Sequence, residues 1–228
     1  MLSKRMMTNV SFVENGARVA DIGCDHGFVS IYLVKHGIAD FVIAMDVGEE
    51  PLKGARAHIK EAGFGEKILT RLSDGLRELT PQDNIDTVII AGLGGRLAIK
   101  ILRDSYEKAI KLKTIILQPQ SELDFVRNEL CKMGFVIDDE RFIVEDGKHY
   151  TTMKLSVGKC EELNPAECMY GPVLLKKKDE ELEQYLLLQK DKFDKIVQMA
   201  RESGSSIDSI EEIERKLKVI DDALKYYT

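Results

Sequence analysis

The chain has 228 residues, of which 44% are hydrophobic and 32% are charged, and its formal net charge is −6. This balance is typical of a globular protein that buries a core, and no apolar run reaches the ~18–20 residues of a membrane span. The composition argues against a membrane protein and against a uniformly basic nucleic-acid-binding protein.

The negative charge is concentrated in the C-terminal quarter. Residues 161–228 hold 11 Lys and Arg against 16 Asp and Glu, a balance of −5, which leaves −1 for residues 1–160. A near-neutral segment can still carry a local basic face, so RNA stays compatible with the N-terminal part.

The N-terminal residues and the cysteines indicate the compartment. The stretch MLSKRMMTNVSFVENG has no apolar segment followed by a small-residue cleavage site, so we expect a cytoplasmic protein. Cys24, Cys131, Cys160 and Cys168 show no C-x-x-C spacing. We therefore expect reduced thiols and no zinc site or other metal centre.

Residues 1–160 alternate between runs rich in Val, Ile and Leu and segments of helical period. We predict strands over 17–22, 40–47, 66–72, 85–93 and 113–119. We predict helices over 27–37, 49–62, 94–110 and 121–133. Apolar strands separated by helices form a parallel sheet covered on both faces, with the ligand site at the carboxyl ends of the strands. The predicted fold class is α/β and Rossmann-like.

The alternation stops after residue 134. Residues 135–158 form two long β-type runs with Asp146-Gly147 near the bend, and no crossover helix fits between them. We predict an antiparallel hairpin and therefore a mostly parallel sheet of seven strands, one of them reversed. This ending is typical of class I methyltransferases and atypical of dehydrogenases.

The C-terminal part has a different pattern. After a linker at 161–172, two apolar seams over 182–200 and 210–224 repeat at spacings of three and four, separated by the turn ESGSS. They predict an antiparallel coiled-coil hairpin, and an ordinary helical pair packed on the first domain is the alternative. We therefore predict two domains, over residues 1–160 and 173–228.

The stretch RVADIGCDHGFVSIYLV (18–34) places Asp21 at the end of the first strand, Gly23 in the turn and Gly27 at the next helix. Amide groups at such a helix start favour an anionic or carboxylate-bearing ligand. A dinucleotide needs close approach of its pyrophosphate to the backbone, which the side chain of Asp25 would obstruct. S-adenosylmethionine has no phosphate, and acidic residues in the turn can meet its ammonium group. Alone, the pattern also fits an ordinary glycine-containing turn.

Acidic residues also follow the next two strands. Asp46 and Val47 end the second strand, where a carboxylate accepts hydrogen bonds from both ribose hydroxyls of a nucleoside. Ser73, Asp74 and Gly75 follow the third strand, where an aspartate can accept from an adenine amino group. Each acid alone is more often a turn residue or a helix cap, but three in this order favour an adenosyl cofactor.

The fourth strand ends in AGLGG (91–95), where methyl transfer would take place. The Asn/Asp-Pro-Pro-aromatic run of amino-directed DNA methyltransferases does not stand there. The glycines offer backbone and space instead, and Gly92 and Leu93 complete the predicted cofactor site.

Several motifs together resemble one family. DIGCDHGF, SDGL, AGLGG, ILQPQ and EDGKHY, followed by a coiled-coil tail, are similar to the bacterial tRNA (adenine-22-N1)-methyltransferase family over essentially the whole chain. The Asp25-His26 pair and AGLGG are the most specific parts. The resemblance implies a Rossmann-like catalytic domain, a helical C-terminal domain, and transfer of the S-adenosylmethionine methyl group to adenine N1 in the tRNA D-loop region.

This chemistry needs few side chains. Adenine N1 has an in-plane lone pair and needs no deprotonation, so positioning should dominate once the base is extruded. Because the product is a cation, we expect Asp25 to give electrostatic support and His26 to orient it or handle a proton. The alternative is that Asp25 only binds the cofactor and His26 only anchors the loop. From their positions, we expect Gln118 and Gln120 to contact the base edge and Tyr150 to stack on the base.

A basic stripe is the predicted tRNA contact. Arg96, Lys100 and Arg103 share one face of the helix after AGLGG, and Lys4 and Arg5 add to this charge. A solvated helix face is the alternative.

Two other functions stay open from the residues alone: a methyltransferase of this fold acting on a protein or small molecule, and a non-catalytic adenosyl-ligand-binding module. The sequence allows either a monomer or a weak homodimer.

Overall fold

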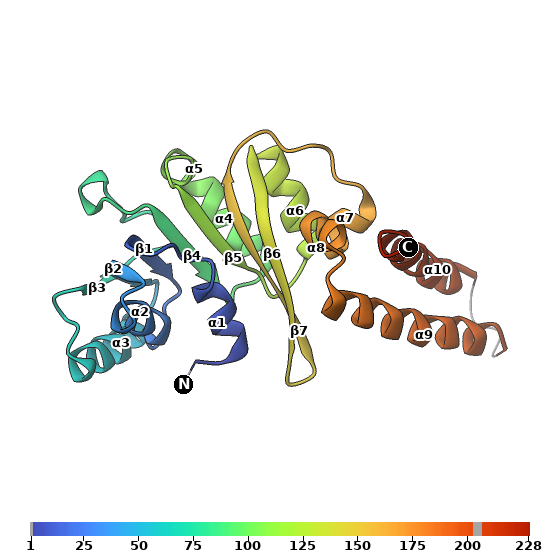
Figure 1. The fold of residues 1–228 in the computed structure, drawn as a ribbon, viewed down its shortest axis with the longest axis horizontal. Coiled ribbons are helices and arrows are strands. Elements are labelled where there is room, and N and C mark those ends of the chain that lie inside the picture. The colour runs from blue at the N-terminus through green and yellow to red at the C-terminus, as the bar shows by residue number, and fades with distance from the viewer. Residues whose placement is uncertain (1, 203–206) are drawn as a thin grey trace.

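The computed structural model describes residues 2–202 and 207–228. Seven strands form one sheet in the order β3-β2-β1-β4-β5-β7-β6 (Figure 1). The strands from β3 to β5 pair in parallel, whereas β7 runs antiparallel to both β5 and β6. The predicted α/β sheet with one reversed strand is confirmed. The strands are β1 (Ala17–Ile22), β2 (Ala39–Asp46), β3 (Ile68–Leu72), β4 (Thr87–Ala91), β5 (Thr114–Gln118), β6 (Phe135–Glu145) and β7 (Lys148–Val157).

Helices cover both faces of the sheet, because successive side chains of a buried strand point to opposite sides. In β1, Val19 packs in the layer of α1 (Lys4–Val10), α2 (Phe28–Lys35) and α3 (Glu49–Ala62). Its neighbour Ala20 packs in the layer of α4 (Gly95–Asp104) and α6 (Leu123–Lys132). A short 3-10 helix, η1 (Pro81–Asp83), precedes β4.

Two helices differ from the prediction. The single helix expected over 94–110 is wrong: it divides at Ser105, whose φ of −123° and ψ of 33° are not helical, into α4 and α5 (Tyr106–Ala109). The N-terminal segment, for which the sequence predicted no element, forms α1. Ser3 begins this helix because its Oγ accepts a hydrogen bond from the Met6 N–H.

The C-terminal helices α9 (Glu180–Glu202) and α10 (Ile207–Leu224) form the predicted antiparallel pair. Ion pairs join them in opposite order along the two helices, from Lys190 to Asp221 and from Arg201 to Glu214. Residues 203–206 of the predicted turn lie outside the described residues.

This pair packs against the edge of the sheet (Figure 1). Leu182 and Leu186 of α9 and Ile220 of α10 share a core with Phe142 of β6. The segment predicted as a linker is itself helical, with α7 (Pro165–Tyr170) capped by Asn164 and α8 (Pro172–Lys177) following at once.

A fully buried ion pair fixes these elements. Arg127 of α6 donates from Nε to Oε1 of Glu140 of β6 at 2.9 Å, and both side chains are 0% exposed. The Arg127 guanidinium also donates to the carbonyl oxygens of Cys168 and Met169, while Glu140 accepts from the Val173 N–H. One pair of side chains therefore holds α6, β6, α7 and α8 together.

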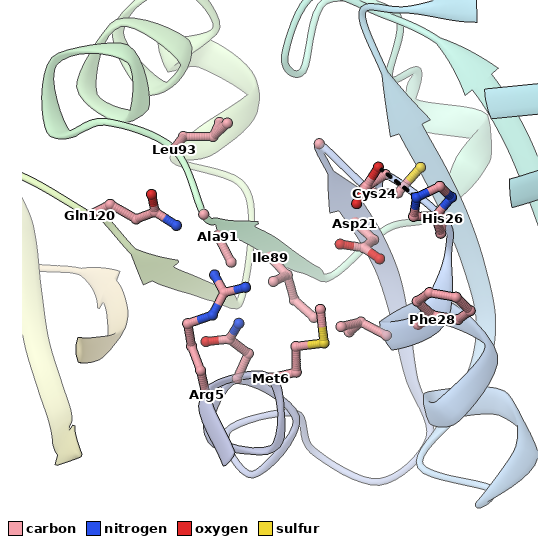
Figure 2. Close-up of a pocket in the computed structure, with 15 residues that line it drawn as sticks. Arg5, Met6, Asp21, Cys24, His26, Phe28, Ile89, Ala91, Leu93 and Gln120 are labelled. Carbon is pink, nitrogen blue, oxygen red and sulfur yellow. Dashed lines mark ion pairs between the residues drawn. The ribbon is translucent and has the colours of Figure 1, made fainter. Parts of the chain in front are cut away.

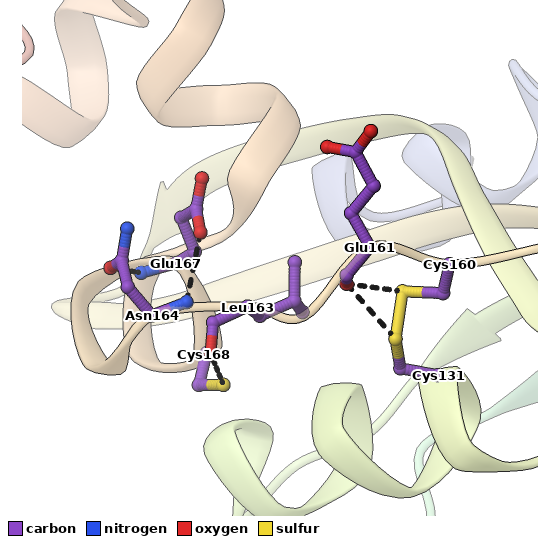
Figure 3. The surroundings of a disulfide bond; sticks show 7 residues. All are labelled: Cys131, Cys160, Glu161, Leu163, Asn164, Glu167 and Cys168. Atoms are coloured by element: carbon purple, nitrogen blue, oxygen red, sulfur yellow. Dashed lines mark hydrogen bonds between the residues drawn. A yellow bond between two sulfur atoms is a disulfide. The ribbon is translucent and has the colours of Figure 1, made fainter.

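A disulfide joins Cys131, at the end of α6, to Cys160 in the segment after β7 (Figure 3). The prediction that all four cysteines are reduced is therefore wrong, because the fold brings together two residues 29 positions apart. Cys24 and Cys168 are free thiols.

Within residues 2–202 and 207–228, no helix is long and apolar enough to cross a membrane. The same residues contain no group of three or more His, Cys, Asp and Glu side chains that could hold a metal ion.

Candidate active site

A cavity of about 300 Å³ opens at the carboxyl ends of β1 and β4 (Figure 2). Three walls surround it: helix α1, the turn from β1 into α2, and the loop that follows β4. The residues that line it are Arg5, Met6, Asn9, Asp21, Gly23, Cys24, Asp25, His26, Phe28, Val29, Ile89, Ala91, Gly92, Leu93 and Gln120.

The turn from β1 into α2 is built on left-handed backbone. Gly23, Asp25 and Gly27 have φ angles of 72°, 50° and 73°. A Cβ at Gly27 would lie 3.3 Å from the Cβ of Ala55 in α3, so glycine lets α2 begin close against α3. Aspartate is one of the few residue types that tolerate this conformation, which explains how Asp25 fits between the two glycines.

Asp25 and His26 lie side by side at the cavity mouth. The distance from Asp25 Oδ1 to His26 Nε2 is 3.6 Å, and more than half of each side chain is exposed. His26 packs over Gly54 of α3, where a Cβ would lie 3.2 Å from its Nδ1. The ring of Phe28, another lining residue, is 46% exposed.

Asp21 is the buried acid of the cavity. Its Oδ2 accepts a hydrogen bond of 2.7 Å from the Ser30 hydroxyl. Burial raises the pKa of Asp21 to about 6, because a carboxylate loses its hydration there, and the Ser30 hydrogen bond opposes this shift only in part.

The predicted cofactor residues at the ends of β2 and β3 lie outside the cavity lining. Asp46 Oδ1 accepts from the Gly48 N–H at 2.9 Å, and Val47 is exposed. Asp74 pairs with Arg77 at 2.9 Å. Because β1, β2 and β3 pair in parallel, their carboxyl ends meet at the same end of the sheet. Asp21, Asp46 and Asp74 therefore lie in a row along this carboxyl edge.

Two glycines shape the loops at this edge. Gly75 has a φ of 63°, and a Cβ there would lie 2.8 Å from Ile101 of α4. Ser73 closes the same turn, because its Oγ donates to the Gly75 carbonyl oxygen at 2.8 Å. A Cβ at Gly95 would lie 2.4 Å from the carbonyl oxygen of Ser121, so AGLGG packs directly on the loop after β5.

The predicted base contacts divide between cavity and core. Gln120 lines the cavity, and its backbone N–H donates to the Leu93 carbonyl oxygen at 2.9 Å. Gln118 is 0% exposed and lies outside the cavity lining. Tyr150 lies under the guanidinium of Arg5, whose Cζ is 5.4 Å from the ring centroid.

Helix α1 supplies three lining residues, of which the sequence analysis singled out only Arg5 (Figure 2). Met6 and Asn9 were missed, although Ser3 is a typical N-cap and could have indicated the helix. The helix is held by Glu145 at the end of β6, whose carboxylate accepts from the Lys4 N–H at 2.6 Å and from the Arg5 N–H at 3.3 Å.

The cations of the predicted basic stripe are paired with acids. Arg96 pairs with Glu122 at 2.6 Å, Lys100 with Asp104 at 2.6 Å, and Arg103 with Glu129 at 2.5 Å. Lys4 likewise pairs with Glu181 of α9 at 3.1 Å. In contrast, Arg5 has no carboxylate partner for its guanidinium in the part of the chain that the structure describes.

Comparison with known proteins identifies similar chains. Residues 2–153 match the family described as "Methyltransferase domain". The chain is 32% identical to the tRNA (adenine(22)-N(1))-methyltransferase of Bacillus subtilis, over 78% of this chain and 76% of that protein.

Solved structures share the fold over nearly the whole chain. A putative tRNA (m1A22) methyltransferase of Streptococcus pneumoniae, in complex with S-adenosyl-L-methionine, has a TM-score of 0.87 and 30% identity, covering 98% of this chain and 100% of that one. M. capricolum TrmK, in complex with S-adenosyl-homocysteine, has a TM-score of 0.82 and 26% identity, with 99% of both chains covered.

Proposed function

We propose, since the chain belongs to the tRNA (adenine(22)-N1)-methyltransferase family, that it transfers a methyl group from S-adenosylmethionine to N1 of adenine 22 in tRNA. The observation that carries the proposal is the position of the cavity. Its lining includes Asp21 and Asp25 on one side, which suit an adenosyl ligand, and Arg5 of helix α1 on the other, whose guanidinium has no carboxylate partner among the described residues.

The residues at the sheet edge fit the cofactor. Oδ1 of Asp46 accepts from Gly48, and Oδ2, which accepts no hydrogen bond from the residues that the structure describes, can accept from ribose hydroxyls. Asp74 is half exposed and can accept from the adenine amino group. Asp21 and the turn through Gly23 are placed to hold the amino acid end. When bound, S-adenosylmethionine supplies an electrophilic methyl group.

The remaining walls suit a nucleobase. The partly exposed ring of Phe28 offers a surface for stacking, and Gln120 offers an amide for the base edge. Asp25, which faces the cavity beside His26, is the nearest exposed carboxylate to favour the cationic product. These groups orient the base and exclude water, which is the main catalytic requirement for a nucleophile that needs no deprotonation.

For the tRNA backbone, Arg5 is the strongest candidate contact. Phosphates approaching Arg96, Lys100 or Arg103 must compete with a carboxylate that already holds each cation. Arg5 lines the cavity with its charge available, steadied by the face of Tyr150. We assign the stripe, Lys4 and the helical domain over 173–228 to weaker, more distant tRNA contacts.

The expected setting is the cytoplasm, where tRNA is found, with the enzyme acting as a monomer or weak homodimer. Nucleoside mass spectrometry of tRNA incubated with the protein and S-adenosylmethionine tests the activity directly. We expect 1-methyladenosine at position 22. A methyl group on another base, or transfer only to a protein or small molecule, would overturn the proposed substrate, and cofactor binding without turnover would indicate a binding module.

A further inference from the structure

A chain of hydrogen bonds runs from the core of the sheet to the cavity. The Nε2 group of Gln118 donates to the hydroxyl of Thr152 at 2.7 Å, and that hydroxyl donates to Oδ1 of Asn9 at 3.2 Å. Gln118 and Thr152 are 0% exposed and Asn9 is 2% exposed. Of the three, only Asn9 lines the cavity, one helical turn after Arg5 on the same face of α1.

The orientation of the Gln118 amide in this chain is fixed by a main-chain group. The Nε2 group of Gln118 also lies 3.2 Å from the carbonyl oxygen of Arg5, which can only accept. Gln118 must therefore present its NH₂, not its oxygen, to both Arg5 and Thr152. In the structure, the Thr152 hydroxyl accepts from Gln118 and donates its single hydrogen to Oδ1 of Asn9.

This order determines what Asn9 offers to a ligand. Its Oδ1 is occupied by Thr152, so its NH₂ group is left without a partner among the described residues. A donor fixed in orientation therefore borders the cavity. Maintaining this arrangement has a cost, because Gln118 Oε1 is buried and accepts no hydrogen bond within the described part of the chain.

We propose that the Asn9 amide is a substrate-binding group that donates a hydrogen bond to a ring nitrogen of the target adenine, N3 or N7. The proposal rests on the proposed function, in which adenine N1 faces the methyl group. N3 and N7 are then the remaining acceptors of the base. Thr152 and Gln118 are positioning residues, because they are fully buried and act only through Asn9.

The first test compares Asn9→Leu, which removes the donor at similar volume, with Asn9→Asp, which keeps the acceptor for Thr152 but has no N–H. We expect both to lower kcat/KM for tRNA by about 3- to 10-fold, the value of one hydrogen bond. The dissociation constant of S-adenosylmethionine, measured by calorimetry, should stay unchanged. An equal loss of cofactor affinity would show that the amide binds the cofactor instead and would overturn the proposal.

The second test identifies the acceptor. Synthetic tRNAs carry 7-deazaadenine or 3-deazaadenine at the target position. With the unaltered enzyme, one of them should be methylated about 3- to 10-fold more slowly than adenine, and with Asn9→Leu this difference should disappear. If the unaltered enzyme methylates both analogues as fast as adenine, the proposal fails. If it does not methylate the natural tRNA at all, the proposed function itself has failed.

The third test separates positioning from folding. Thr152→Val removes the hydroxyl that orients Asn9, whereas Thr152→Ser keeps it. We expect Thr152→Val to lower kcat/KM and Thr152→Ser to restore it, with little change in cofactor affinity. Thr151→Val is the matched control, because Thr151 is 2% exposed on the same strand and takes no part in the chain. Equal effects of the two valine variants would overturn the positioning role.

Discussion

Asp21 is a buried carboxylate in the lining of the proposed cofactor site. Its pKa is raised to about 6 by desolvation, so the residue is ionised above that pH and neutral below it. In the proposed site, Asp21 meets the ammonium group of S-adenosylmethionine, which only its ionised form attracts. We therefore expect the affinity for the cofactor to fall as the pH drops through 6, by up to about tenfold per pH unit. Calorimetric titrations between pH 5 and 8 measure this.

Ser30→Ala provides the control for Asp21. It removes the hydrogen bond that stabilises the ionised form, so the pH midpoint should move upward. Asp21→Asn should bind S-adenosylmethionine weakly at every pH, and its affinity should not change as the pH passes through 6. A transition that persists in Asp21→Asn would assign it to another group.

Arg5 is the residue at which we expect the largest electrostatic effect on tRNA. Arg5→Gln removes a cavity-lining cation that has no carboxylate partner in residues 2–202 and 207–228, and it should weaken tRNA binding by about tenfold at moderate salt. Arg96→Gln removes a cation that Glu122 already neutralises and should have a smaller effect. Filter-binding titrations at two salt concentrations compare them. Equal losses of tRNA affinity in the two variants would favour the basic stripe as the main tRNA contact.

Among single residues, the sequence predicted the positions of those whose place in the fold depends only on the order of the strands. Asp21 and Asp46 lie at the carboxyl ends of β1 and β2, so strand order alone placed them at one edge. The burial of Gln118 was not predictable, because it depends on α1, more than 100 positions away, packing over the end of β5. The carboxylates that pair with Arg96 and Arg103 come from α6 and the residue before it, and no local pattern indicates them.

Among the elements, α6 and β6 depend on one buried ion pair. Arg127→Met should lower the free energy of unfolding by about 3–5 kcal/mol, because it leaves the carboxylate of Glu140 buried without its partner. Urea unfolding measures the change. Lys195→Met, which removes an exposed ion pair within α9, is the control and should have little effect. A similar result for both variants would contradict the assigned role of Arg127.

The elements that were predicted correctly have a clear repeating pattern of apolar residues. Seven strands and the hairpin followed from apolar runs and from the Asp146-Gly147 turn. The break at Ser105 was missed, since the helical period continues across it. The short helices α7 and α8 were also missed, because α7 depends on its Asn164 cap and on Arg127, and α8 on a hydrogen bond to Glu140, rather than on a long apolar seam.

In the whole molecule, the C-terminal tail, which consists of helices α9 and α10, packs against the edge strand β6. Deleting residues 179–228 removes Leu182, Leu186 and Ile220 from the core around Phe142 and also removes the Glu181–Lys4 contact with α1. We expect the shortened chain to bind S-adenosylmethionine but to methylate tRNA at least tenfold more slowly, with lower thermal stability. Calorimetry, nucleoside analysis and thermal unfolding measure the three properties.

Glu181→Gln in the full chain isolates the contact with α1. A loss of methylation in this variant with unchanged stability would show that the tail also acts through the helix that lines the cavity. Full methylation by the shortened chain would remove the tail from the proposed function altogether.

The hydrogen bonds that the first turn of α1 donates to the Glu145 carboxylate have a consequence for folding during synthesis on the ribosome. Lys4 and Arg5 are made about 140 residues before Glu145, whose carboxylate accepts hydrogen bonds from their N–H groups. Domains fold as units while the chain is being made. We therefore expect helix α1 to dock only after the β6–β7 hairpin has left the ribosomal tunnel, so that the cavity proposed as the active site forms late and an incomplete chain does not engage tRNA.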